Sequence, residues 1–254
     1  MQPDMSEVAS REQIGLSGPL VVGLGEALFD CFADSRHVGG APVNCAVHSD
    51  ALLRAVGGQG VVASAVGDDG LGKEFFSFLK ARSLASQFVQ VDPARATGRV
   101  LVSLDEQGEP AYLIEGDVAW DHLQYDVQWK RLACSCQAVC YGTLAQRSPA
   151  SRQTIVAFLQ DARQAIKLLD VNLRQSFYSA DLLLESLQLA TAAKFNLTEL
   201  VSVGRMLGLT ARETPEIDEL ANQFLDVFKL DWVAVTRGSA GTALYADHAI
   251  FEAA

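Results

Sequence analysis

The chain has 254 residues, of which 49% are hydrophobic and 20% are charged, and its formal net charge is −11 at pH 7. This length suits one large domain, or a large and a small one, and the acidic balance argues against nucleic acid or an anionic membrane surface as a partner. No apolar run reaches the length of a membrane span, and residues 1–17 are polar without the apolar core of a signal peptide. We therefore expect a loose leader over residues 1–19 of a cytoplasmic protein.

The five cysteines do not suggest a disulfide framework. Their number is odd and they lie in apolar segments, which fits reduced thiols. The spacing of Cys134, Cys136 and Cys140 hints at a metal site, but no second Cys/His pair follows at zinc-finger spacing, and residues 137–141 read as a buried strand. We therefore do not expect zinc here.

The first predicted strand, residues 20–25, is short, apolar and ends in glycines. A dinucleotide-binding turn of the form G-x-G-x-x-G would need a glycine where Leu28 stands, and residues 26–33 read as a second strand rather than a helix. Both observations argue against a dinucleotide-binding fold. Asp30 in this second strand is either a half-exposed surface carboxylate or an acceptor for two adjacent hydroxyls of a polyol, because an ionised carboxylate offers two acceptor oxygens.

A glycine pair, Gly39 and Gly40, precedes the first predicted helix. Adjacent glycines can adopt positive φ and let another group approach the backbone, Pro42 is preset for a first helical turn, and residues 43–56 read as helical. The turn is either a plain loop-to-helix junction or a place where exposed helix N-terminal amides meet a polar or anionic ligand.

Residues 61–66 form the next predicted strand, and the segment after it matches G-x-x-x-x-G-K by letter. A phosphate-binding P-loop needs Ser or Thr at the next position to hold Mg²⁺. Glu74 stands there, and two aspartates within the turn would repel phosphate. The segment therefore predicts a turn followed by a helix over residues 73–82.

The rest of the chain predicts a small lid sheet and a βα repeat. Residues 97–105 and 110–115 alternate apolar and polar around a turn at 107–108, so they predict a hairpin that joins the strand near residues 28–34 in the lid. Further strands are predicted over residues 138–141, 166–170, 193–195 and 232–236, and helices over 149–164, 180–191, 197–207 and 215–228. This alternation predicts an α/β fold with a mostly parallel central sheet flanked by helices.

Several segments together carry a resemblance to a known family. They are Gly25-Glu26 with Asp30, and residues 39–44, 66–72, 97–100, 105–109, 141–148, 170–174, 194–199 and 236–241. In order and spacing, residues 20–254 resemble the ribokinase or PfkB family of carbohydrate kinases, and most closely its fructokinase-like branch. The resemblance implies a ribokinase-like α/β domain with a β lid, and phosphorylation of a sugar, fructose above all, with ATP and Mg²⁺ as cofactors.

The resemblance also assigns site residues at the carboxyl ends of strands, where open α/β sheets bind ligands. The sugar-binding set is Asp30, Gly39, Gly40, Asn44 and Asn172. Arg174 is a candidate for offsetting charge that develops during phosphoryl transfer. The nucleotide-binding set is Lys194, Thr236, Gly238 and Gly241, although the last three residues also read as a simple strand-ending turn.

Asn196 and Glu199 resemble the family's motif that contacts Mg²⁺ indirectly, through water. The same pair also reads as a capping box, in which an Asn at the N-cap and a Glu three residues later satisfy each other's backbone N–H groups. Both roles are compatible, and the sequence leaves them open.

Two departures from the family pattern matter. The helix between Asn44 and Gly57 is about one turn longer than usual, with residues 48–51 as the extra piece, so we expect a local distortion there. The second departure has the larger consequence. The Gly-Ala-Gly-Asp turn that should follow a strand pair around residues 241–252 occurs nowhere in the chain.

In the family that turn supplies the catalytic base and the anion hole. We therefore expect a chain that lacks the C-terminal part of the fold, leaves an apolar face of its sheet uncovered and is inactive as given. The alternative is a non-catalytic, truncated homologue or sugar-binding pseudokinase; a dinucleotide-dependent oxidoreductase is a distant third. The lid sheet could pair two copies into a homodimer, and spacing does not fix which sugar is bound.

Overall fold

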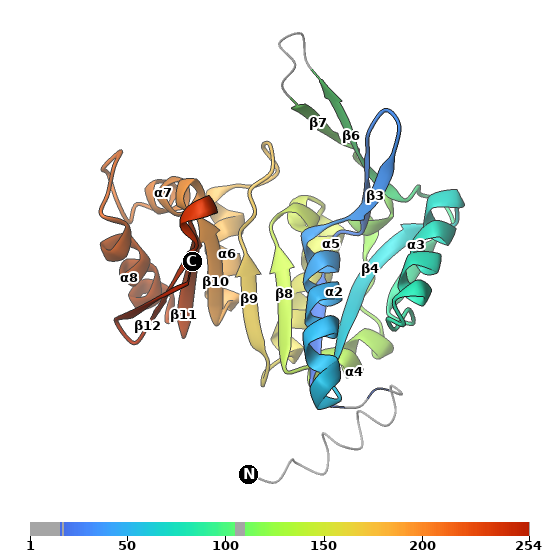
Figure 1. Ribbon diagram of the computed structural model, residues 1–254, viewed down its shortest axis with the longest axis horizontal. Helices are drawn as coiled ribbons and strands as arrows, with labels where there is room; N and C mark the ends of the chain where they lie inside the picture. Colours follow the sequence, from blue (N-terminus) through green and yellow to red (C-terminus); the bar gives the residue numbers. More distant parts are fainter. Residues whose placement is uncertain (1–15, 17, 105–109, 254) are drawn as a thin grey trace. The chain divides into compact units, whose positions relative to one another are not determined.

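The computed structural model describes residues 16, 18–104 and 110–253, and it divides into two compact units (Figure 1). Unit 1 comprises residues 1–140 and 145–165, and unit 2 comprises residues 141–144 and 166–254. Strand β8 (Ala138–Gly142) contributes residues to each. The predicted leader lies almost entirely outside the described residues, and the first strand begins at Leu20.

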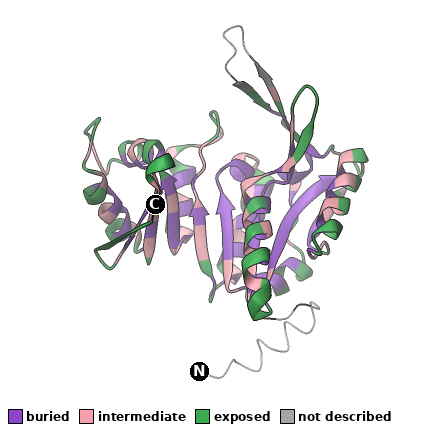
Figure 2. Ribbon diagram, in the orientation of Figure 1, coloured by how far each residue is buried: buried purple, intermediate pink, exposed green. Residues whose placement is uncertain are grey.

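Unit 1 contains a sheet segment in the order β8-β1-β4-β5, in which the pairs β1/β4 and β4/β5 are parallel. Its further strands are β1 (Leu20–Leu24), β4 (Gln59–Gly67) and β5 (Val89–Asp92). Its helices are α2 (Ala41–Leu53), α3 (Gly70–Ala81), α4 (Val127–Ser135) and α5 (Pro149–Asp161), with short 3₁₀ turns at Arg54–Val56 and Ala119–His122. Strand β4 is buried along almost its whole length (Figure 2), as expected for a parallel strand covered on both faces.

A separate four-stranded sheet forms the lid of unit 1 and projects beside the start of α2 (Figure 1). Its strands, in spatial order, are β3 (Arg36–Gly39), β2 (Leu28–Cys31), β6 (Gly98–Leu104) and β7 (Pro110–Ile114). The predicted hairpin of β6 and β7 is confirmed, although its turn lies outside the described residues. The predicted strand over residues 28–34 is wrong in extent, because the chain turns back after Cys31, where Phe32 N–H donates to the Ser35 carbonyl, and forms β3.

Helix α3 begins three residues earlier than predicted. Asp69 is its N-cap and accepts a hydrogen bond from Gly72 N at 2.7 Å, which satisfies an amide that the first helical turn cannot pair internally. The segment that matches a P-loop by letter is thus a capped helix start, as the sequence predicted.

The extra turn of α2 is built into the fold rather than distorted. The helix is continuous through residues 48–51, and the buried Asp50 in this piece accepts from Gly60 N at 3.2 Å and from Arg54 Nε at 2.6 Å. The expected local distortion is therefore wrong, because Asp50 in the inserted turn forms a hydrogen bond with strand β4 and so stabilises the longer helix.

Unit 2 continues the βα pattern. Its sheet order is β13-β12-β11-β10-β9-β8, with the pairs β9/β10 and β10/β11 parallel and the pairs β11/β12 and β12/β13 antiparallel. The strands are β9 (Ile166–Asp170), β10 (Ala192–Asn196), β11 (Trp232–Thr236), β12 (Thr242–Ala246) and β13 (Ala249–Ala253). The helices are α6 (Ala180–Leu189), α7 (Leu197–Met206) and α8 (Ile217–Phe228).

One face of the unit 2 sheet is well covered and the other is not. Val233, Val235 and Tyr245 are buried beneath the helices, whereas the alternate residues Trp232 and Leu244 are only half-buried. The exposed apolar patch expected from the sequence stays a prediction.

The predicted α/β class with a mostly parallel sheet is confirmed. Among the described strands and α-helices, β3, β5 and α4 were not predicted. Cys134 is exposed near the end of α4, and Cys136, which follows the helix, is buried. Within the part of the chain that the structure describes, no helix is both long and apolar enough to cross a membrane.

Candidate functional site

The Asp30 carboxylate lies against the backbone of Gly39. Strands β2 and β3 pair Leu28 with Gly39 and Asp30 with His37. A Cβ atom placed on Gly39 would lie 2.5 Å from Asp30 Oδ2 and 3.0 Å from Leu28 Cδ1, so any other residue here would displace the Asp30 carboxylate. Glycine at this position therefore lets the carboxylate approach the main chain at the root of the lid.

The start of α2 follows Gly39 in the chain and has no side-chain cap. Gly40 is the N-cap with φ 107° and offers no side-chain hydrogen bond to the helix, and a Cβ there would overlap the Glu26 carbonyl oxygen. Asn44 is exposed in the first turn, and its N–H donates to the Gly40 carbonyl at 3.0 Å. A glycine N-cap leaves the first amides of the helix without a side-chain partner, which suits a polar ligand.

A network centred on Asp69 ties the lid to α3. Besides Gly72 N, the carboxylate accepts from Thr97 N and Thr97 Oγ1, each at 2.8 Å, immediately before β6 begins. Burial raises the pKa of Asp69, but the hydrogen bonds from Thr97 and Gly72 outweigh it, so that the pKa lies below its usual value. The carboxylate is thus held ionised as a structural anchor.

A buried ion pair holds the other end of the lid. Arg147 donates from Nε and Nη2 to the two oxygens of Asp121, both at 2.8 Å, and the two side chains are 7% and 5% exposed. The guanidinium also donates to the Glu115 carbonyl, at the end of β7, and lies 4.0 Å from the ring centroid of Trp120. These contacts fix the residues that follow β7.

In unit 2, Asn196 and Glu199 form the capping box that one interpretation of the sequence predicted. Asn196 Oδ1 accepts from Glu199 N at 2.8 Å, and Glu199 Oε2 accepts from Asn196 N at 2.9 Å. The second oxygen of Glu199 accepts from Leu173 N at 3.1 Å, and the residue is only 6% exposed. Glu199 therefore also fixes the loop that follows β9.

That loop carries two of the predicted residues. Asn172 has φ 40°, an uncommon left-handed conformation outside glycine, and Arg174 is exposed with Nη1 donating to the Leu173 carbonyl at 3.2 Å. Nearby, Lys194 Nζ lies 2.9 Å from Asp170 Oδ1 at the end of β9. Lys194, predicted to bind the nucleotide, thus has a carboxylate partner that the sequence analysis did not assign.

The remaining predicted residues follow β11. Thr236 is paired with Asn196 in the sheet, and its hydroxyl donates to the Phe195 carbonyl at 3.3 Å. Gly238 and Gly241 have φ 58° and 81°; Gly238 is the first residue of a short 3₁₀ turn and Gly241 follows its last residue. In unit 2 the carboxyl ends of β9, β10 and β11 therefore bring the predicted nucleotide and metal residues to one edge of the sheet.

The structure groups the predicted residues in two sets, each described in its own unit. Unit 1 holds Asp30, Gly39, Gly40 and Asn44, and unit 2 holds the others. Sequence reasoning missed His37, which lies directly across from Asp30. The only signal for it was the weak alternation of the short strand β3.

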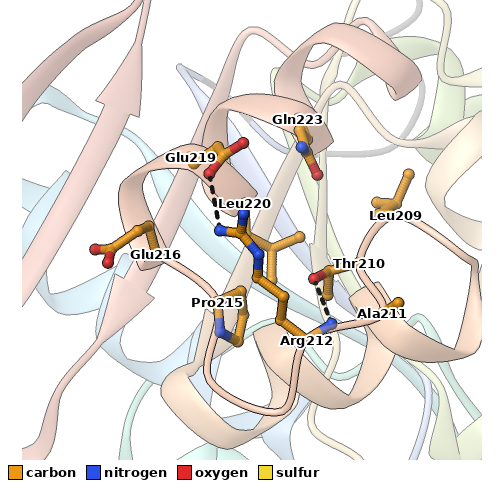
Figure 3. A pocket seen from close by; sticks show the side chains of 9 residues that line it. All are labelled: Leu209, Thr210, Ala211, Arg212, Pro215, Glu216, Glu219, Leu220 and Gln223. Atoms are coloured by element: carbon orange, nitrogen blue, oxygen red, sulfur yellow. Dashed lines mark hydrogen bonds and ion pairs between the residues drawn. The ribbon is translucent and has the colours of Figure 1, made fainter.

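Two surface hollows are lined by residues that the sequence analysis did not assign to a site. One, of about 270 Å³, lies between the α7–α8 loop and α8 (Figure 3), where the exposed Arg212 faces Glu219 at 3.9 Å; it includes none of the predicted site residues. The other, of about 410 Å³, lies between the lid and the start of α3, and its lining includes Arg36, Asp69 and Arg99.

The chain belongs to the pfkB family of carbohydrate kinases, whose family model matches residues 21–254. This confirms the resemblance drawn from the motifs. A curated relative, probable fructokinase-5 of Arabidopsis thaliana, is 25% identical over 245 residues, which cover 89% of this chain and 72% of that protein. The chain spans between 29 and 64% of three further curated relatives.

Solved structures share the fold. Fructokinase from Vibrio cholerae O395 in its apo form has a TM-score of 0.76 and 24% sequence identity, with 94% of this chain and 81% of that chain covered. An uncharacterised sugar kinase from Pyrococcus horikoshii in complex with ATP has a TM-score of 0.75 and 22% identity, with 92% and 76% covered. Both likenesses establish the ribokinase-like α/β fold of this chain.

Proposed function

We propose that this protein phosphorylates a sugar hydroxyl with ATP, and that fructose is the acceptor. The observation that carries the proposal is the Asp30 carboxylate lying against Gly39, beside an α2 N-terminus that has no side-chain cap. A carboxylate can accept hydrogen bonds from two neighbouring hydroxyls of one sugar. A side-chain-free backbone lets the ring lie close to it.

In this proposal the unit 1 residues position the acceptor. Phosphoryl transfer depends mostly on placing the attacking hydroxyl in line and on stabilising the transferring group. Asp30 and Asn44 hold hydroxyls that do not react, and Gly39 and Gly40 provide room for the ring. Asn172 and Arg174 of unit 2 act toward the transferring phosphoryl group, where a guanidinium offsets developing charge.

The nucleotide is assigned to Lys194, Thr236, Gly238 and Gly241. Positive-φ glycines leave the backbone accessible to phosphate oxygens, and the Lys194 ammonium adds charge, although Asp170 neutralises part of it.

Asn196 and Glu199 fit Mg²⁺ only through water. Their oxygens already accept backbone N–H groups, while each carboxylate oxygen keeps a second acceptor site. When bound, the ion neutralises phosphate charge.

The 254-residue chain contains no Gly-Ala-Gly-Asp turn, to which the resemblance assigns the catalytic base. We therefore propose that this chain alone binds sugar without turnover; a sugar-binding pseudokinase is the alternative for the protein as a whole. An ATP-consumption assay with fructose and Mg²⁺ tests this, and turnover at ordinary kinase rates would refute it.

We also propose that the protein is cytoplasmic and that two copies pair through the lid sheet.

Calorimetric titration with fructose tests the acceptor site. Asp30→Ala should weaken binding by about 100-fold, because a charged acceptor of two hydrogen bonds is removed. Asp34→Ala is the matched control, since Asp34 is an exposed carboxylate in the same hairpin and should leave the affinity unchanged. Equal affinities of the two variants would contradict the proposed role of Asp30.

A further inference from the structure

The register of the lid places a second polar side chain beside Asp30. Strand pairing aligns Asp30 with His37 on β3 and with Val100 on β6, and Val100 with Ile114 on β7. Directly paired residues point to the same face of a sheet and lie next to each other. The imidazole therefore stands on the same face of the lid as the carboxylate, and His37 is exposed.

An aromatic ring adjoins this pair. Phe32, two residues beyond Asp30, is 47% exposed, and its ring contacts the His37 ring edge-on with centroids 6.0 Å apart and an interplanar angle of 61°. A carboxylate, an imidazole and an exposed aromatic ring thus lie together at the β2–β3 hairpin. Small-molecule sites combine apolar and aromatic surface with a few polar groups in this way.

We propose that Phe32 and His37 complete the acceptor site and select an uncharged sugar. In this arrangement His37 hydrogen-bonds a hydroxyl next to those held by Asp30, since a neutral imidazole offers one donor and one acceptor. The Phe32 ring packs against the apolar C–H surface of the sugar. This inference rests on the proposed function.

The arginines of the lid face the other way. Arg36 and Arg99 alternate with His37 and Val100 along their strands, so they lie on the opposite face, toward α3. Each is held by a carboxylate: Arg36 by Glu74 at 2.6 Å and Arg99 by Glu115 at 2.7 Å.

Among the described lid residues, no arginine or lysine lies on the Asp30 face. A phosphate on the acceptor would therefore lie near the Asp30 carboxylate, with no arginine or lysine of the described lid strands on that face to offset the repulsion. The site accordingly suits a free sugar rather than a sugar phosphate.

Calorimetry on the full 254-residue chain tests the proposal. Phe32→Ala and His37→Ala should each weaken fructose binding about three- to tenfold, the range expected for one aromatic contact or one hydrogen bond. His37→Gln should recover part of the loss, because an amide can still donate and accept. Leu113→Ala is the matched control: Leu113 is 60% exposed on the opposite face of the lid and should leave the affinity unchanged.

The outcomes separate the two proposals. If Asp30→Ala abolishes fructose binding while Phe32→Ala and His37→Ala do not change it, this inference is overturned and the proposed function stands. If the wild-type chain binds none of fructose, glucose and ribose, both are overturned. Tighter binding of fructose 6-phosphate than of fructose would refute selection of an uncharged acceptor. A Phe32→Ala variant that changes only sedimentation, not fructose affinity, would assign Phe32 to self-association instead.

Discussion

Asp30 in unit 1 and Glu199 in unit 2 are both carboxylates assigned to ligand binding, yet their surroundings differ. Asp30 is half-buried on a lid strand and lies against a glycine backbone. Glu199 is 6% exposed and accepts N–H groups from Asn196 and Leu173.

In unit 1 the proposed function assigns binding and scaffolding to different residues, because Arg147, Asp121 and Asp69 hold the lid while Asp30 is assigned to the sugar. In unit 2 the proposed function gives both roles to the same residues. Substitutions should reveal this difference, since only in unit 1 can affinity change without a loss of stability.

The largest stability effect is expected at Arg147. Arg147→Leu leaves Asp121 as a buried carboxylate without its main partner, which should lower the free energy of unfolding by about 3–5 kcal/mol. Urea denaturation followed by circular dichroism measures this. Arg36→Ala is the control, because its pair with Glu74 has similar distances but side chains 56% and 39% exposed, and such pairs contribute about 1 kcal/mol or less. Similar losses in both variants would show that the end of the lid after β7 is not held by the buried pair.

Glu199→Ala should cost less stability but should also affect binding. Two backbone N–H groups lose their acceptor, so the free energy of unfolding should fall by about 2–3 kcal/mol. Because the loop with Asn172 is released, ATP affinity measured by calorimetry should fall as well. Glu216→Ala, which removes an exposed carboxylate at the start of α8, should change neither quantity. A Glu199 variant with weaker ATP binding and unchanged stability would contradict the double role.

Much of unit 2 could be predicted from the sequence because its signals are local. The strand over residues 166–170 is apolar and bounded by turn residues. Helix α7 begins at a capping box formed by Asn196 and Glu199, whose spacing can be recognised in the sequence. The predicted ends of the unit 2 strands therefore agree with the structure to within one residue.

Unit 1 was less predictable because its key contacts are long-range. Strand β3 has four residues, of which Arg36 and His37 are exposed, so its alternation is too short to distinguish it from a loop. The start of α3 was placed too late because Gly70 and Gly72 weaken a helical pattern. The neighbourhood of Asp30, Gly39 and His37 depends on a register that no spacing in the sequence determines.

The smallest expected effect concerns Asp69, and its sign follows from its pKa. The folded-state pKa lies below the unfolded value, so the ionised group stabilises the fold above about pH 4 and this contribution is lost as the pH falls further.

Asp69→Asn should lower the free energy of unfolding by about 1–2 kcal/mol at pH 7, since an amide replaces an N-cap carboxylate that also accepts from Thr97. Near pH 3 the difference from the wild type should shrink, because below about pH 4 the unfolded chain binds a proton at this carboxyl and the stabilisation by the ionised form declines. Urea denaturation at both pH values measures this, with Asp68→Asn, at the exposed neighbouring position, as the control. A difference that grew on acidification would show that Asp69 anchors the lid as a neutral group, and the separation of scaffold from ligand site in unit 1 would then depend on Arg147 and Asp121 alone.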